Sequence, residues 1–436
     1  MNGGAGPGRR RAATEGPLVI RGGDVVTPEG VVRGDVVIED GRVVAVVPGG
    51  HGGRSGAPHH RPVEAEGLLV LPGMVDAHVH FDEPGRVHWE GFDTGSAAAV
   101  AGGVTTVVDM PIDCDPPTVT AAAVGAKADA ALAHSRVDVA MWGGLVPASV
   151  AHLGELLDAG VVGFKAFACP SGWAEFPPAD AACLTAGLDV AAAAGVPVAV
   201  HCELAAEGHT VESEVAAVRW AAGLAAAAGA RLHVVHASCA AAVDEARRWP
   251  TVTVETCPHY LLLDDRTAAE IGPRARCFPP IRSMADRLAL WDRVLSGAVD
   301  TLASDHSPCP PERRVGPEAW GGIDGVGLTV PLLLGEARLP LERLVALTTA
   351  AARLLGLSGK GALAAGFDAD VVLVDPAATW TVTEPALRTR HRAAPYTGMT
   401  VRGRVVATFV RGRLVFDGRD VGPPGGGRVL RRGRAG

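Results

Sequence analysis

The feature that most constrains the fold is a regular alternation of short apolar segments with alanine-rich segments through the middle of the chain. The apolar segments have the length of strands, and those between them, such as 179–194 and 212–228, have helical character. Strands that alternate with helices indicate a parallel sheet, and eight such strands predict a (β/α)8 TIM-type barrel of the α/β class. The expected strands span residues 74–79, 104–109, 137–141, 161–166, 197–201, 232–236, 252–255 and 300–304.

Both ends of the chain have a different pattern, because they consist of short strand candidates separated by turns that contain glycine. These β-rich ends, residues 17–69 and 363–420, predict one small β-sandwich domain beside a barrel of residues 70–362. The outermost segments, 1–16 and 421–436, are rich in glycine and arginine. We expect both to be flexible tails, the second one basic.

The composition argues against several classes of function. Hydrophobic residues make up 48% of the 436 residues, and the net charge of −8 favours neither nucleic acid nor an anionic membrane as a partner. The sequence has neither an apolar run of about 18 residues nor the apolar core of a signal peptide. The eight cysteines include no C-x-x-C pair, which indicates a reducing compartment rather than a disulfide framework. We therefore expect a cytoplasmic protein.

Residues with metal-binding chemistry follow the predicted strands at their carboxyl ends, the face where barrel enzymes carry their active sites. His78 and His80 are separated by one residue, so both side chains project from the same face of a strand. The same face is expected to receive Lys165, His201, His236 and Asp305. Each residue alone has an ordinary interpretation: a surface or rim histidine, a lysine directed to solvent, or a helix N-cap. Six of them on one face favour a shared metal centre.

Three motifs occupy these positions: Pro72–His80 (PGMVDAHVH), Gly163–Lys165 (GFK) and Ser304–His306 (SDH). Together they resemble the amidohydrolase superfamily, in the branch of cyclic amidases that includes dihydroorotases, hydantoinases and allantoinases. Further segments are similar to the allantoinases in particular, namely residues 84–86, 88–92, 101–111, 142–144, 255–260, 304–312 and 319–323.

The resemblance implies a centre of two divalent metal ions. His78, His80 and Asp305 would hold the more buried ion, and His201 and His236 would hold the more exposed one. Zinc is expected, although manganese, cobalt, iron or nickel would suit the same nitrogen and oxygen ligands. Relatives in this branch are commonly homodimers or homotetramers, so we expect a homo-oligomer.

The same resemblance implies the chemistry. Lys165, carboxylated on its amine by carbon dioxide, would bridge the two ions. Asp305 would accept a proton from the attacking water and return it to the departing ring nitrogen. The implied reaction, a step of purine and ureide catabolism, is hydrolytic opening of the hydantoin ring of a small cyclic ureide, allantoin, to give allantoate.

Several positions depart from the family pattern. Asp82 stands where dihydroorotases carry an arginine for the substrate carboxylate, which argues against dihydroorotate. Asp113 stands where asparagine is usual, and Phe278 where serine is common. We expect Asp113, Phe278 and Asp324 to contact the substrate, although Asp113 also suits an ordinary turn. The segment between the histidines at 201 and 236 is shorter than usual, which could change the pocket.

Two alternatives therefore accompany the allantoinase interpretation. One is a hydantoinase-like, dihydropyrimidinase-like or dihydroorotase-like enzyme that acts on another cyclic ureide. Hydantoinases generally have a tyrosine soon after the bridging lysine, whereas this chain has Phe167, Ala168 and Cys169 there. The other alternative is a barrel that serves as a non-catalytic scaffold. A scaffold has no physical need for four histidines, a lysine and an aspartate around one cavity.

Overall fold

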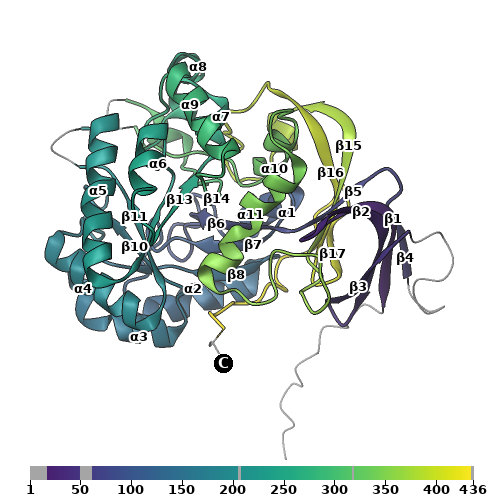
Figure 1. Ribbon diagram of the computed structural model, residues 1–436, viewed down its shortest axis with the longest axis horizontal. Helices are drawn as coiled ribbons and strands as arrows, with labels where there is room; N and C mark the ends of the chain where they lie inside the picture. Colours follow the sequence, from purple (N-terminus) through teal and green to yellow (C-terminus); the bar gives the residue numbers. More distant parts are fainter. Residues whose placement is uncertain (1–16, 50–60, 205–207, 317–318, 434–436) are drawn as a thin grey trace, which may run out of the picture.

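A computed structural model describes residues 17–49, 61–204, 208–316 and 319–433. A barrel surrounded by helices lies beside a sheet domain that contains strands from both ends of the chain (Figure 1). The tail expected over residues 1–16 lies outside the described residues.

The barrel strands follow one another around the barrel in chain order. They are β6 (Met74–Val79), β7 (Val104–Asp109), β8 (Asp138–Met141), β9 (Gly143–Gly144), β10 (Phe164–Phe167), β11 (Pro197–His201), β12 (Arg231–Val234), β13 (Val252–Thr256) and β14 (Thr301–Leu302). β6 to β8 form one parallel sheet and β9 to β14 form another. Only Trp142 separates β8 from β9, so these two pieces together take the third of eight positions. The predicted (β/α)8 barrel is confirmed.

Backbone hydrogen bonds join the two parallel sheets at both seams. Val162 N donates to Met141 O at 3.0 Å, and His80 N donates to His306 O at 2.7 Å. The second bond connects the first and last barrel strands just beyond their ends. Residues that follow β6 and β14 are therefore neighbours, although more than two hundred residues separate them in the sequence.

The helices cover the outside of the barrel (Figure 1). They are α1 (Phe92–Ala101), α2 (Ala121–His134), α3 (Leu153–Ala159), α4 (Ala181–Ala194), α5 (Val211–Ala228), α6 (Ala240–Ala246), α7 (Pro258–Leu262), α8 (Asp265–Ile271), α9 (Met284–Leu295), α10 (Thr329–Leu334) and α11 (Leu341–Leu355), with short 3₁₀ helices at Pro147–His152, Gly272–Ala275, Pro311–Arg314 and Glu384–Ala386. Local sequence explains their ends. For α4, the Asp180 carboxylate accepts the Cys183 backbone N–H, and Gly195 ends the helix with φ of 63°.

The two ends of the chain build one sheet domain, as predicted. Its strands are β1 (Leu18–Thr27), β2 (Gly30–Glu39), β3 (Arg42–Pro48), β4 (Arg61–Glu64), β5 (Leu69–Pro72), β15 (Val371–Thr381), β16 (Thr400–Val410) and β17 (Arg413–Phe416). They form one hydrogen-bonded sheet, in which β5 lies between β1 and β15 and so joins the two chain ends. A separate apolar cluster, which includes Ile20, Ile38, Leu373 and Phe409, fills its core.

The segment 421–433 differs from the flexible tail that the sequence suggests. Its backbone pairs with the barrel, since Leu430 N donates to Val139 O and Arg428 N donates to a carboxylate oxygen of Asp138. Arg432 donates a guanidinium hydrogen bond to Ala194 O at the end of α4, where a cation is favourable. Glycine and arginine content alone gives no sign of these docking partners.

The described helices include none that combines the length and the apolar character needed to cross a membrane.

Candidate active site

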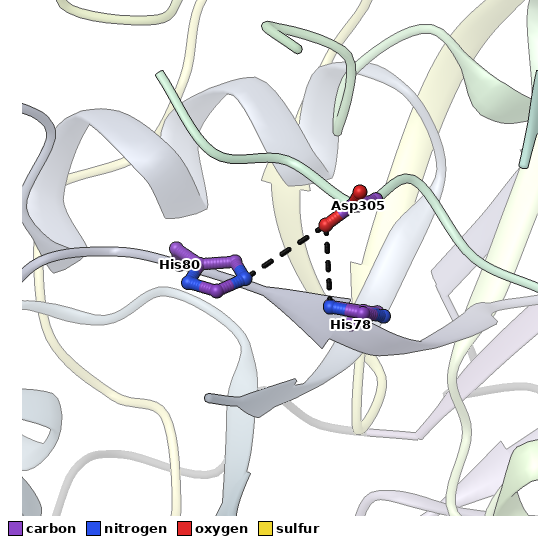
Figure 2. A group of neighbouring side chains, drawn as sticks. All are labelled: His78, His80 and Asp305. Carbon is purple, nitrogen blue, oxygen red and sulfur yellow. Dashed lines mark ion pairs between the residues drawn. The ribbon is translucent and has the colours of Figure 1, made fainter. Parts of the chain in front are cut away.

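His78 and His80 lie at the end of β6, on either side of its last residue, and both imidazoles point toward Asp305 (Figure 2). Nε2 of His78 lies 3.2 Å from Asp305 Oδ1, and Nε2 of His80 lies 3.8 Å from the same oxygen. All three side chains are buried, and their ligand atoms lie within 4.8 Å of one another. Two nitrogens and a carboxylate oxygen at these spacings can hold one divalent ion.

His201 and His236 form a second pair beside the first. Nδ1 of His201 lies 3.0 Å from Nε2 of His236, and the His236 ring centroid lies 5.3 Å from that of His78. Two nitrogen ligands on one tetrahedral ion stand about 3.3 Å apart when each bond is about 2.0–2.1 Å. The observed spacing therefore suits a second ion next to the first.

Lys165 lines the same pocket, lies within β10 and is fully buried. Its Nζ has no hydrogen-bond partner among the described residues. Burial lowers the pKa of Lys165 to about 8, against the opposing effect of the carboxylates of Asp305 and Glu255. A buried ammonium without a hydrogen-bond partner costs more free energy than a buried neutral amine. Its surroundings therefore favour the neutral, nucleophilic amine.

Two carboxylates that the sequence analysis gave no role hold the histidines in place. Glu255, the fourth residue of β13, lies 2.7 Å from Nδ1 of His78 and accepts the backbone N–H of His236 at 3.2 Å. Glu203 lies 2.9 Å from Nε2 of His201. A carboxylate on one ring nitrogen leaves the other free for a metal and fixes the tautomer. Glu255 ends a predicted strand and Glu203 lies two residues after His201, so the sequence positions of both already place them at the active-site face of the barrel.

The electrostatics favour the neutral forms of His78, His201 and His236 and the ionised form of Asp305. Burial lowers the pKa values of His78, His201 and His236, and for His236 the neighbouring His201 adds to the effect. Burial alone would raise the pKa of Asp305, but His78 and His80 counteract it and hold the pKa below its usual value. Neutral imidazoles and an ionised carboxylate are the forms that bind a metal ion.

A further histidine, His259, lies close to Asp305. Ligand atoms of Cys257, His259 and Asp305 lie within 4.8 Å of one another. Burial lowers the pKa of His259 to about 4, so this ring is neutral near pH 7. His259 belongs to the segment 255–260 that is similar to the allantoinases, but no one-dimensional pattern places it against a residue 46 positions away.

The three expected substrate contacts fall into two groups. Asp113 and Phe278 line the same pocket as the six metal-site candidates. Asp324 is not among the described residues that line it. Its carboxylate accepts hydrogen bonds from Thr389 Oγ1 at 2.7 Å and from Ala393 N at 2.9 Å. Asp324 therefore stabilises the loop before β16 rather than facing the pocket.

The fold and the site together define a hydrolase-type barrel with a histidine, lysine and aspartate centre at the carboxyl ends of its strands. Residues 69–415 match the amidohydrolase family, and the chain belongs to it. It is 43% identical to an allantoinase of Rubrobacter xylanophilus over 95% of this chain and 97% of that protein. It is 41% identical to an allantoinase of Solibacter usitatus over 95% of this chain and 96% of that protein.

Solved structures with the same fold include two cyclic amidases. An L-hydantoinase (dihydropyrimidinase) from Arthrobacter aurescens superimposes with a TM-score of 0.90 at 31% identity, over 95% of this chain and 99% of that chain. A dihydropyrimidinase from Brevibacillus agri has a TM-score of 0.85 at 29% identity, over 95% of this chain and 98% of that chain.

Proposed function

We propose that this protein is a metal-dependent hydrolase that opens the hydantoin ring of allantoin to give allantoate. The observation that carries the proposal is the convergence of four histidines, a buried lysine and an ionised aspartate in one pocket. Relatives named allantoinase, similar along nearly the whole chain, support allantoin as the substrate.

The donor set fits a pair of divalent ions. His78, His80 and Asp305 would hold one ion, and His201 and His236 would hold the other. Zinc suits these ligands, as do manganese, cobalt, iron and nickel. When bound, such ions lower the pKa of a coordinated water and polarise a carbonyl group.

Lys165 would join the two halves of the site after its neutral amine adds to carbon dioxide. The nitrogen forms a bond to the carbon of carbon dioxide and loses one proton, which gives a carbamate with two oxygen ligands. The unpartnered Nζ and the lowered pKa of Lys165 support this step, because only the neutral amine can react. A free ammonium at the same place would repel both cations.

Asp305 is the proposed catalytic base and acid. Its pKa is held low, so at neutral pH it can accept a proton from the attacking water. The water oxygen bonds to the scissile carbonyl carbon, the ring C–N bond breaks, and the proton passes from Asp305 to the departing nitrogen. Glu255 and Glu203 keep His78 and His201 oriented throughout, because both contacts are buried.

The pocket favours a neutral substrate over an anionic one. Among the described residues, its lining includes no arginine that could bind the carboxylate of an anionic substrate such as dihydroorotate. Asp82, at the position where dihydroorotases carry that arginine, is buried and does not line the pocket. Burial raises the pKa of Asp82, and nearby Asp113 raises it further, so its neutral form is favoured. Allantoin is neutral and rich in N–H donors, so it tolerates carboxylate neighbours.

A hydantoinase is the second candidate function, because solved hydantoinases share the fold closely. The test is a substrate panel on protein loaded with zinc, manganese or cobalt in bicarbonate. We expect metal-dependent formation of allantoate from allantoin, with hydantoin, dihydrouracil and dihydroorotate opened much more slowly. Faster opening of hydantoin or dihydrouracil would assign the second function. Metal binding without opening of any ring would support a scaffold.

We further propose a cytoplasmic homo-oligomer. All eight cysteines are buried free thiols, which suits a reducing compartment. Size-exclusion chromatography with light scattering distinguishes a monomer from the dimer or tetramer that we expect.

A further inference from the structure

Asp113 lies between a candidate metal ligand and the wall of the pocket. Its Oδ2 makes an ion-pair contact of 2.6 Å with Nδ1 of His80, and its Oδ1 accepts a hydrogen bond from the indole N–H of Trp173 at 2.5 Å. The residue is only 6% exposed, and its backbone is left-handed, with φ of 69°. Both oxygens of this carboxylate therefore already have protein neighbours, which leaves little capacity for a substrate contact.

Trp173 belongs to an aromatic wall that it forms with Trp89 and Trp320. The Arg86 guanidinium lies 3.8 Å from the centre of its ring, and Arg86 also donates to Cys114 O and to Glu175. The ring centroid of Trp173 lies 5.2 Å from that of Trp320, which lines the pocket. Movement of Trp173 would therefore move the wall that faces the substrate.

We propose that Asp113 is a positioning residue that holds His80 for the metal and Trp173 for the substrate at the same time. For Nε2 of His80 to bind a metal, Nδ1 must carry the proton, and the Asp113 carboxylate favours that tautomer. This inference rests on the proposed metal-dependent function and replaces the direct substrate contact expected from the sequence.

In this chain, the two neighbours of Asp113 account for a carboxylate where asparagine is usual. Trp173 donates a hydrogen bond to one oxygen of Asp113, and the other oxygen lies at ion-pair distance from Nδ1 of His80. A carboxylate suits both contacts because it has two acceptor oxygens. Asparagine has one acceptor oxygen and one NH₂ group. In Asp113→Asn, one of the two donors would face another donor. Asparagine tolerates the left-handed backbone well, so this substitution changes the hydrogen bonding with little backbone strain.

The experiment compares Asp113→Asn, Trp173→Phe and a matched control, Asp115→Asn. Asp115 lies two residues away in the same loop and is exposed, so its substitution removes the same charge without touching the site. Metal-free protein is titrated with zinc, and KM and kcat for allantoin are measured on fully loaded protein. Thermal unfolding of each variant shows whether it folds.

We expect Asp113→Asn to bind zinc about 10–100-fold more weakly than wild type. We expect Trp173→Phe to keep the zinc affinity within about twofold and to raise KM severalfold with little change in kcat, because only the wall is loosened. Asp115→Asn should match wild type in every measurement.

Several outcomes overturn the inference. If Asp113→Asn binds zinc like Asp115→Asn and only KM rises, Asp113 contacts the substrate directly. If Trp173→Phe changes neither KM nor kcat, the wall is not held through this contact. If Asp113→Asn does not fold, NMR of the zinc-loaded wild type tests the proposal instead. We expect a slowly exchanging Nδ1 proton on His80, and the absence of this proton would contradict the proposal. If wild type binds no zinc, the proposed function itself fails.

Discussion

The buried amine of Lys165 gives a quantitative prediction about its reaction with carbon dioxide. Only the neutral amine reacts, and the pKa of this lysine is lowered to about 8 by burial. The neutral fraction is then about 1% at pH 6, about 50% at pH 8 and about 99% at pH 10. A lysine with the ordinary pKa of 10.5 would be about 0.3% neutral at pH 8 and about 24% at pH 10.

These fractions set the expected rates. At a fixed concentration of dissolved carbon dioxide, the initial rate of carboxylation should rise about 50-fold from pH 6 to pH 8. From pH 8 to pH 10 it should only double, whereas an ordinary lysine would gain about 75-fold over that interval. The sign follows from burial, which disfavours the charged ammonium and so moves the titration to lower pH.

The assay mixes metal-free protein rapidly with isotopically labelled carbon dioxide and traps the carbamate by adding zinc. We expect one equivalent of label per chain, and none in Lys165→Ala. Lys127 is an internal control, because it is equally buried but lies 3.1 Å from the Asp109 carboxylate, which helps to raise its pKa and keeps it charged. A rate that keeps rising tenfold per pH unit above pH 8, or label that persists in Lys165→Ala, would refute the reasoning.

Three further predictions follow from single contacts. Asp305→Asn should keep part of the bound metal but lower kcat by about 10²–10⁴-fold, because it removes the proton acceptor. Steady-state kinetics together with metal analysis test this, and a wild-type kcat in the variant would exclude the role. Glu255→Gln should weaken metal binding about 10–100-fold, because an amide orients His78 less firmly than the carboxylate 2.7 Å from it; an unchanged zinc titration would contradict this. Deleting residues 421–436 should lower the free energy of unfolding by about 2 kcal/mol, because it removes the partly buried Leu430 and the backbone hydrogen bonds to Val139. Thermal unfolding measures the loss of stability, and an unchanged midpoint would show that the segment does not stabilise the barrel.

The barrel and its metal-site candidates could be predicted because their signals are local. An apolar strand followed by a polar residue can be recognised in a sequence window of about ten residues, and the carboxyl ends of all barrel strands lie on one face of the barrel. His78, Lys165, His201 and Asp305 were placed in this way, and the structure brings them into one pocket.

The remaining features depend on contacts between distant segments. Asp113 and Trp173 are 60 residues apart, and no periodic pattern connects them. Asp324 was expected at the pocket, but its partners Thr389 and Ala393 come from a segment whose position only the folded chain reveals. The basic segment 421–433 resembles a solvated tail in composition, yet its backbone hydrogen bonds fix it to the barrel. Composition indicates whether a segment can be solvated. It does not reveal docking through backbone N–H and C=O groups, because nearly every residue has them.

The most direct test of the central claim, that two ions in this pocket open a cyclic ureide, is a metal titration of activity. Metal-free protein in bicarbonate receives zinc in steps while allantoate formation from allantoin is followed. The account predicts no activity without metal and a rise that ends at two equivalents per chain, with no such rise in Lys165→Ala. Full activity in metal-free protein, or a rise that ends at one equivalent, would contradict it.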